Sequence, residues 1–205
     1  MGPDATGGRL GGAPDDLTAG AIRTVPAVDA AAAVAELLRS RGADGIEHPG
    51  GTLDAHLERV RLHLGELGAG EDLQLAGRAH AVYGTDGFDV ALLRLDERPL
   101  LGGIIGADAE LLVYRYGACD RARTWRALPS PRQVHDRFTG EVEVLTDDEA
   151  RAFVELSLVN ELDVAEHAPG FLDRHGDFFR RLTADWAALL GPAVTAEASR
   201  ILGAR

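Results

Sequence analysis

The sequence predicts an all-α protein, because helically spaced apolar residues, helix caps and helix-ending glycines recur along most of the chain. A capping-box signature, Thr146 followed by Glu149, precedes a long helical segment. An apolar stripe with intervals of four and three is typical of a buried helix face. Its members are Leu53, Leu57, Val60, Leu64 and Leu67.

The first half of the chain predicts three helices in order. Residues 26–41 form an Ala-rich helix that ends before Gly42. After a turn at residues 48–51, Thr52 is the expected N-cap of a helix over 53–67. Residues 71–83 form the third helix, which stops at Gly84, and the small residues within it favour a close approach of another backbone.

The second half predicts further helices around one irregular stretch. We expect helices at residues 103–118, 120–127, 147–166, 171–190 and 193–202, and a short extended piece at Glu141–Leu145. Residues 1–25 are rich in glycine and predict a disordered tail. Residues 26–205 are then a single helical domain, since 205 residues with 45% apolar content suit one core.

Composition restricts the partners. With 33 acidic and 21 basic residues, the formal charge is −12, which repels nucleic acid and anionic membrane surfaces. No stretch has the roughly 18 apolar residues of a membrane span, so we expect no nucleic-acid or membrane partner. The single cysteine, Cys119, has no intramolecular disulfide partner, which favours a reducing cytoplasm.

Polar residues on the predicted helices suggest a site. His56 and His80 lie 24 residues apart on successive predicted helices, and both are expected to point toward the protein interior. Asp163 shares a sector of its helix with apolar residues. A buried carboxylate without a partner costs several kcal/mol, so we expect Asp163 to meet a metal, a histidine or an arginine.

Two strings carry a resemblance to a known superfamily: His48-Pro49-Gly50-Gly51-Thr52 with His56 shortly after it, and His80-Ala81-Val82-Tyr83-Gly84-Thr85. Over roughly residues 33–190 the chain resembles the HD-domain superfamily, in an uncharacterised bacterial, HD-like form. The resemblance implies an HD-like helical bundle with a buried metal-type pocket. It also implies that His56, His80 and, by placement, Asp163 hold one divalent ion, either Fe, Mn or Zn. Ala81 stands where the superfamily has its Asp.

Three further residues are candidates for catalysis. Asp86 or His48 would assist proton transfer, and Tyr83 would orient a small polar substrate. The alternative for Tyr83 is core packing with its hydroxyl bonded to a neighbour. The stretch after His80 departs from the Glu-Asp-Thr of the superfamily's ppGpp hydrolases, which argues against that activity.

Three functions remain open from the sequence. The first is a metal-dependent enzyme that acts on a small polar molecule by hydrolase, lyase or non-haem iron oxygenase chemistry. The second is a metal-free, degenerate HD-like protein that binds a small ligand, which the loss of the Asp at position 81 favours. The third is a helical interaction or scaffold protein.

Overall fold

The computed structural model describes residues 27–203, and in this range the chain is helical, as predicted. The helices are α1 (Ala27–Ser40), α2 (Leu53–Glu66), α3 (Glu71–Ala79), α4 (Arg98–Ile105), α5 (Ala107–Ala118), α6 (Arg121–Ala127), α7 (Asp147–His167), α8 (Phe171–Asp185) and α9 (Pro192–Gly203). Two short 3₁₀ helices span Ala43–Gly45 and Leu95–Glu97. The predicted tail, residues 1–25, lies outside the described residues.

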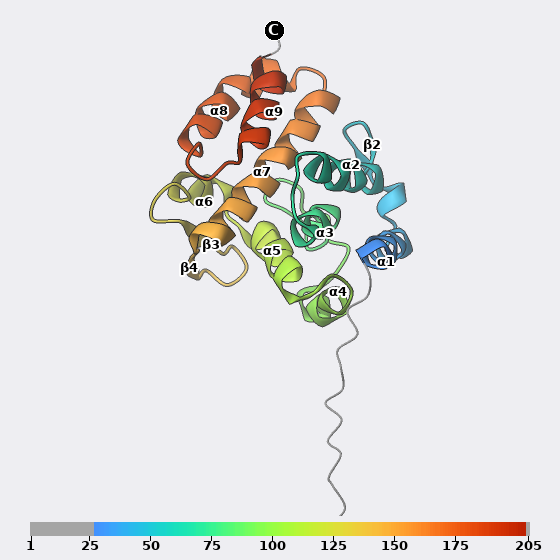
Figure 1. The fold of residues 1–205 in the computed structure, drawn as a ribbon. Helices are drawn as coiled ribbons and strands as arrows, with labels where there is room; N and C mark the ends of the chain where they lie inside the picture. The colour runs from blue at the N-terminus through green and yellow to red at the C-terminus, as the bar shows by residue number, and fades with distance from the viewer. Residues whose placement is uncertain (1–26, 204–205) are drawn as a thin grey trace, which may run out of the picture.

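Helix α7 is the centre of the bundle. It contacts α2, α3 and α5 on one side and α8 and α9 on the other (Figure 1). Its capping box is present, since Thr146 accepts from the Glu149 backbone N–H and the Glu149 carboxylate accepts from the Thr146 backbone N–H. A helix with neighbours on most sides has no wide polar face, and the whole stretch 156–163 is buried.

Helix α2 forms as the sequence predicts. The Thr52 hydroxyl caps it by accepting a hydrogen bond from the backbone N–H of Ala55 at 3.3 Å. Four of the five stripe residues are fully buried: Leu53, Leu57, Val60 and Leu64. Their burial places the same face of α2, with His56 on it, against α3 and α7.

Helix α3 is shorter than predicted. It ends at Ala79, and residues 80–83 continue as a turn. Gly84, with a φ of 72°, then reverses the chain in a backbone conformation that favours glycine. Helix α5 packs closely on this turn at Gly117, where an added Cβ would lie 2.9 Å from the Gly84 carbonyl oxygen. The turn therefore holds the residues after His80 in a fixed place.

Further differences concern the remaining elements, among them the helix predicted at residues 171–190, which ends at Asp185. The predicted helix 103–118 is two helices, α4 and α5, which meet at Gly106 with a φ of 87°. Two antiparallel strand pairs are present in the described residues. They are β1 (Glu47–His48) with β2 (Gly51–Thr52), and β3 (Gln133–His135) with β4 (Val142–Val144). The extended piece expected at Glu141–Leu145 is confirmed by β4.

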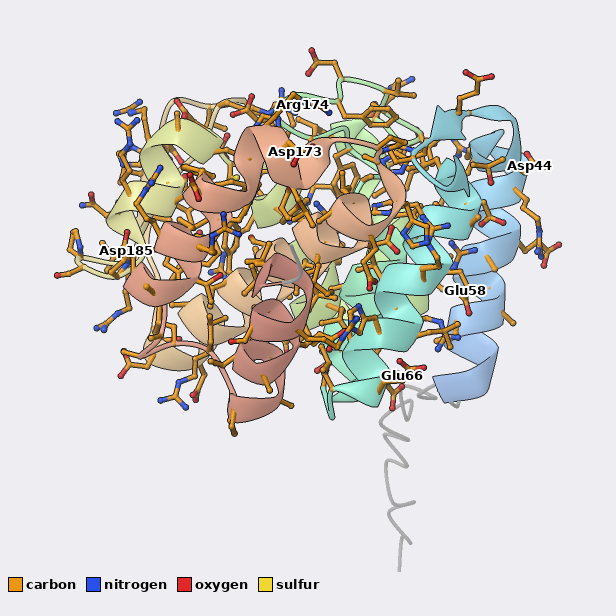
Figure 2. All side chains as sticks on the ribbon, turned by 90° about the horizontal axis from the view of Figure 1, so that it is seen from above. Asp44, Glu58, Glu66, Asp173, Arg174 and Asp185 are labelled. Atoms are coloured by element: carbon orange, nitrogen blue, oxygen red, sulfur yellow. The ribbon has the colours of Figure 1, made fainter. Side chains whose placement is uncertain are left out.

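The charge of the chain is spread over its outer surface. Acidic side chains from several helices and loops project outward in Figure 2, among them Asp44, Glu58, Glu66, Asp173 and Asp185. No helix within residues 27–203 has the length and apolar character needed to cross a membrane.

Candidate functional site

Three histidines from three separate elements meet beside α7. The rings of His48 on β1 and His56 on α2 are stacked, with centroids 4.0 Å apart. The ring of His80, just after α3, meets His56 edge to face at 5.2 Å. The predicted proximity of His56 and His80 is therefore confirmed, and the β1–β2 turn adds His48 to the pair.

A small cavity of about 150 Å³ lies against these rings. It is lined by His48, Leu53, His56, His80, Ala81, Thr85, Asp86, Gly87, Phe88, Arg121, Asn160, Glu161 and Val164. Thr85 and Phe88 exchange backbone hydrogen bonds of 2.9 Å, which fix the turn that forms one wall. The turn at residues 85–88 therefore closes one side of the cavity.

His80 lines the cavity and has one of its two ring nitrogens bonded to the backbone. Its Nδ1 contacts the Gly77 carbonyl oxygen at 2.8 Å, so this nitrogen carries the proton and Nε2 is an acceptor. Burial, aided by the charge of His56, lowers the pKa of His80 to about 3. The ring is therefore neutral at neutral pH.

His48 is a second neutral ring. Burial lowers its pKa to about 4, and the charge of His56 contributes in the same direction. Its Nδ1 is buried and has no hydrogen-bond partner among the described residues. A buried polar atom without a partner costs about 1–3 kcal/mol, which a suitable ligand would recover.

Both ring nitrogens of His56 contact side chains of α7. Its Nδ1 lies 2.6 Å from Asp163 Oδ2, and its Nε2 lies 2.9 Å from Asn160 Oδ1. The Asn160 amide N–H in turn donates to Glu161 Oε1 at 3.0 Å, which sets the orientation of the amide. A ring protonated on both nitrogens donates to both oxygens, so this arrangement suits the imidazolium form.

Asp163 lies behind His56 and does not line the cavity. Arg59 donates to its two oxygens at 2.7 and 2.9 Å. Burial acts to raise the pKa of the Asp163 carboxyl, but the hydrogen bonds from His56 and Arg59 outweigh burial and lower it. Of the three partners expected for this carboxylate, the histidine and the arginine are confirmed. The sequence predicted that Asp163 would face the pocket as the last metal ligand, but its carboxylate lies outside the cavity lining.

Glu161 and Arg121 complete the wall, and sequence reasoning did not select them. Arg121 Nη1 pairs with Glu161 Oε1 at 2.9 Å, and the Arg121 backbone N–H donates to Asp86 Oδ2 at 2.9 Å. Burial raises the pKa of the Glu161 carboxyl, and the charge of Arg121 opposes this. Helical periodicity gives no sign of Glu161, because it identifies one buried face and α7 is buried around most of its circumference.

Tyr83 is not part of the site. Its hydroxyl donates to Glu110 Oε1 at 2.8 Å, and Arg98 pairs with the same carboxylate. Burial raises the pKa of Tyr83 far above its usual range. The sequence suggested that Tyr83 orients a substrate, with core packing as the alternative. The structure agrees with the alternative, because the ring is buried and its hydroxyl is bonded to Glu110. His48 and Asp86, the other two candidates for catalysis, do line the cavity.

The predicted metal site does not match the arrangement of the side chains. Within the described residues, no group of three or more His, Cys, Asp or Glu side chains is placed to hold a metal ion. The physical reason is that both oxygens of Asp163 face Arg59 and His56, while both nitrogens of His56 face oxygens of α7. An ion would have to displace these bonds.

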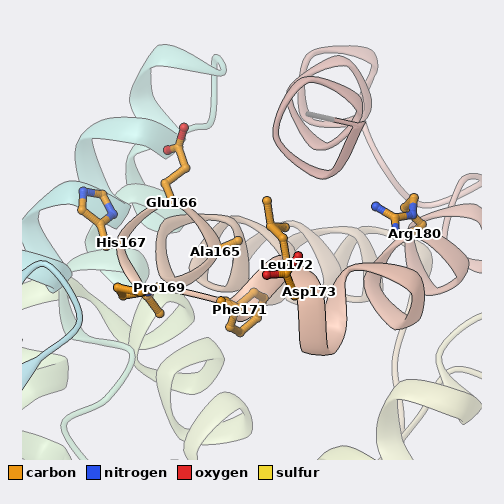
Figure 3. Close-up of a pocket in the computed structure, with 10 residues that line it drawn as sticks. Ala165, Glu166, His167, Pro169, Phe171, Leu172, Asp173 and Arg180 are labelled. Carbon is orange, nitrogen blue, oxygen red and sulfur yellow. The ribbon is translucent and has the colours of Figure 1, made fainter. Parts of the chain in front are cut away.

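A wider groove of about 770 Å³ lies where α7 passes into α8 (Figure 3). Three of its polar side chains, those of Glu166, His167 and Arg180, already have partners. Glu166 pairs with Arg200 at 2.9 Å, and Arg180 contacts the Leu202 carbonyl oxygen and Asp177. His167 Nδ1 contacts the Asp163 carbonyl oxygen at 2.7 Å. The histidine cavity is the better candidate because its polar atoms are left for a ligand.

Comparison with known proteins adds one similarity. Residues 37–121 match the family model of a domain of unknown function, DUF6817. The matched segment is less than half of the chain and contains His48, His56, His80 and Asp86, whereas Asn160, Glu161 and Asp163 of α7 lie beyond it. No curated protein and no solved structure matches the chain.

Proposed function

We propose that this chain binds a small, hydrogen-bond-donating molecule in the histidine cavity through its own side chains. The observation that carries the proposal is the pair of neutral rings, a partly buried His48 and a buried His80, beside a cavity of about 150 Å³. The proposal corresponds to the second function expected from the sequence, a metal-free HD-like binding protein. The relation to the HD superfamily is part of the proposal.

The size of the cavity limits the ligand. An interior cavity of about 150 Å³ holds a molecule of the size of benzene, about six heavy atoms. The polar walls distinguish this cavity from an apolar one, which stays dry. We therefore expect a compact polar ligand or a few ordered waters in its absence.

The polar atoms of the walls define the chemistry of the ligand. His80 Nε2 accepts hydrogen bonds, because its Nδ1 carries the proton. The Asp86 carboxylate, which accepts one bond from the Arg121 backbone, has a second oxygen for another donor. Acceptors on two walls select a ligand with at least two O–H or N–H groups, such as a small polyol or amino alcohol.

The other two functions have less support. A metal-dependent enzyme needs three donors around one point, which the described side chains do not provide. A scaffold needs no polar cavity, and unpaired buried polar atoms such as His48 Nδ1 would only cost stability there. In a binding site, a ligand can form the hydrogen bonds that these atoms lack.

The test is a titration with glycerol in which binding is monitored through the NMR signals of the His48 and His80 rings. We expect saturable shifts with glycerol and none with acetate, which is of similar size but carries only acceptors. His48→Phe keeps a ring stacked on His56 but removes both nitrogens, so it should weaken glycerol binding without unfolding the protein. Ala81→Leu, which fills the cavity, should abolish binding.

Two results would contradict the proposal. One is an unchanged glycerol response in both variants. The other is stoichiometric Zn²⁺ binding that requires His56, His80 and Asp163, which would restore the metal centre expected from the sequence.

A further inference from the structure

A third cavity, lined by aromatic and cationic side chains, lies between α6 and α8. It measures about 460 Å³, within the range of small-molecule sites. We call it the α6–α8 groove. It is lined by Arg121, Ala122, Trp125, Arg126, Pro129, Phe178, Arg181, Leu182 and Asp185. The two helices lie next to each other at one side of the molecule (Figure 1).

Aromatic rings form one wall of this groove. Phe178 is 45% exposed, and its ring is stacked with that of Trp125 at a centroid distance of 6.2 Å. Trp125 is almost fully buried, and its indole N–H has no hydrogen-bond partner among the described residues. An exposed phenyl ring over a buried indole is a platform for a flat ligand.

Cationic side chains flank the platform. Arg126 and Arg181 are both exposed, and neither has a hydrogen-bond or ion-pair partner among residues 30–203. Helical spacing places Arg181 on the same face of α8 as Phe178, three residues earlier. Arg121 also lines the groove, but Glu161 neutralises it. Asp185, on the same face of α8, would repel an anionic ligand.

Charge and shape select one kind of ligand. Free guanidinium groups recognise phosphate or carboxylate groups, and the platform adds a preference for a planar ring. A nucleic-acid strand is disfavoured because the chain as a whole carries a formal charge of −12. We propose that the α6–α8 groove binds a small aromatic anion of the mononucleotide type, with its ring on Phe178 and Trp125 and its anionic group paired with Arg126 and Arg181.

The proposal does not depend on the histidine cavity, because the residues changed in its test line the groove alone. The probe is adenosine 5′-monophosphate, titrated into the full chain and followed by tryptophan fluorescence. Trp125 and Trp186 are the two tryptophans of the sequence, and Trp186 is fully buried. Adenosine supplies the ring without the charge, and inorganic phosphate supplies the charge without the ring.

We expect saturable quenching by the monophosphate and at least tenfold weaker binding of adenosine and of phosphate alone. Arg126→Gln and Arg181→Gln should each weaken binding about fivefold, the size of one charge-assisted contact near the surface. Phe178→Ala should weaken it by about fivefold or more through lost stacking. Asp185→Asn should tighten it, because it removes the opposing charge.

Arg151→Gln is the matched control. Arg151 is an exposed arginine on α7 without a partner among the described residues, so the variant has the same net charge as the two groove variants. Its affinity should equal that of the unmodified protein. The proposal is overturned by adenosine or phosphate binding as tightly as the monophosphate, by an equal effect of Arg151→Gln, or by no saturable binding at millimolar concentration.

Discussion

Replacement of Asp163 by Asn tests whether the carboxylate behind His56 holds α2 and α7 together. Asp163 is 4% exposed and accepts hydrogen bonds from His56 and Arg59 on α2. Asn has the same shape but is neutral and offers one acceptor oxygen. In the variant, Arg59 loses its anionic partner, and the new amide N–H groups face donors.

The expected loss follows from the burial of the pair. Breaking a buried ion pair by removal of one partner costs about 3–5 kcal/mol. The Arg59 side chain is 26% exposed, so water solvates part of its freed charge. We therefore expect the lower end, about 3 kcal/mol. For a chain of this length, this loss lowers the melting temperature by about 6–12 °C.

The loss should depend on pH in a defined direction. The pKa of Asp163 is lower in the folded chain than in the unfolded chain. Its contribution is therefore fully present above the unfolded value, about 3.9, and is lost as the pH falls through the folded value. The free energy of unfolding of Asp163→Asn should be lower than that of the unmodified protein by a constant amount from pH 7 to about 5. This difference should become smaller below about pH 4.

The assay is urea unfolding followed by circular dichroism at pH values from 7 to 3. Asp173→Asn is the control, because Asp173 is exposed on α8 and has no ion-pair partner among the described residues (Figure 2). It should change the free energy of unfolding by less than about 0.5 kcal/mol. The reasoning is refuted if the two variants are equally stable at pH 7.

Two further predictions concern the site and the fold. The ring signals of His48 and His80 should not titrate between pH 8 and 5, since the pKa values are lowered to about 4 and about 3. Unfolded histidine has a pKa near 6.5, so their contribution to stability is complete above that value and declines as the pH falls toward the folded values. An NMR titration with a midpoint above pH 5.5 for either ring would contradict this. Gly117→Ala should destabilise the protein by about 1–2 kcal/mol, because the new Cβ meets the Gly84 carbonyl oxygen. Gly103→Ala, with no atom within 4 Å of its new Cβ, should stabilise helix α4 by about 0.5–1 kcal/mol. Thermal unfolding of both variants checks the pair, and a Gly117→Ala protein as stable as the unmodified one would show that the contact at Gly117 has no role.

Local signals in the sequence were sufficient for most of the helices. The cap at Thr52, the capping box at Thr146 and the apolar stripe of α2 involve residues within one or two helical turns, and each is present as predicted. The same signals placed the end of α3 too late, at residue 83. The contacts that end this helix early, such as the bonds from the Leu92 and Leu93 backbone to the Val82 carbonyl oxygen, join residues about ten positions apart.

The apolar pattern of the sequence alone also predicted that His56 and His80 would both face the interior, and both are buried although His80 follows the last residue of α3. The tertiary structure decided what they do there. Whether Asp163 faces a metal, a histidine or an arginine depends on the position of Arg59, which is 104 residues away in the chain. Tyr83 is directed away from the cavity by Glu110, and Arg121 is brought to it by Glu161. Helical periodicity sets the direction of each side chain along its own axis, but the partner of a buried polar group is set by how separate helices pack, and no local pattern encodes that.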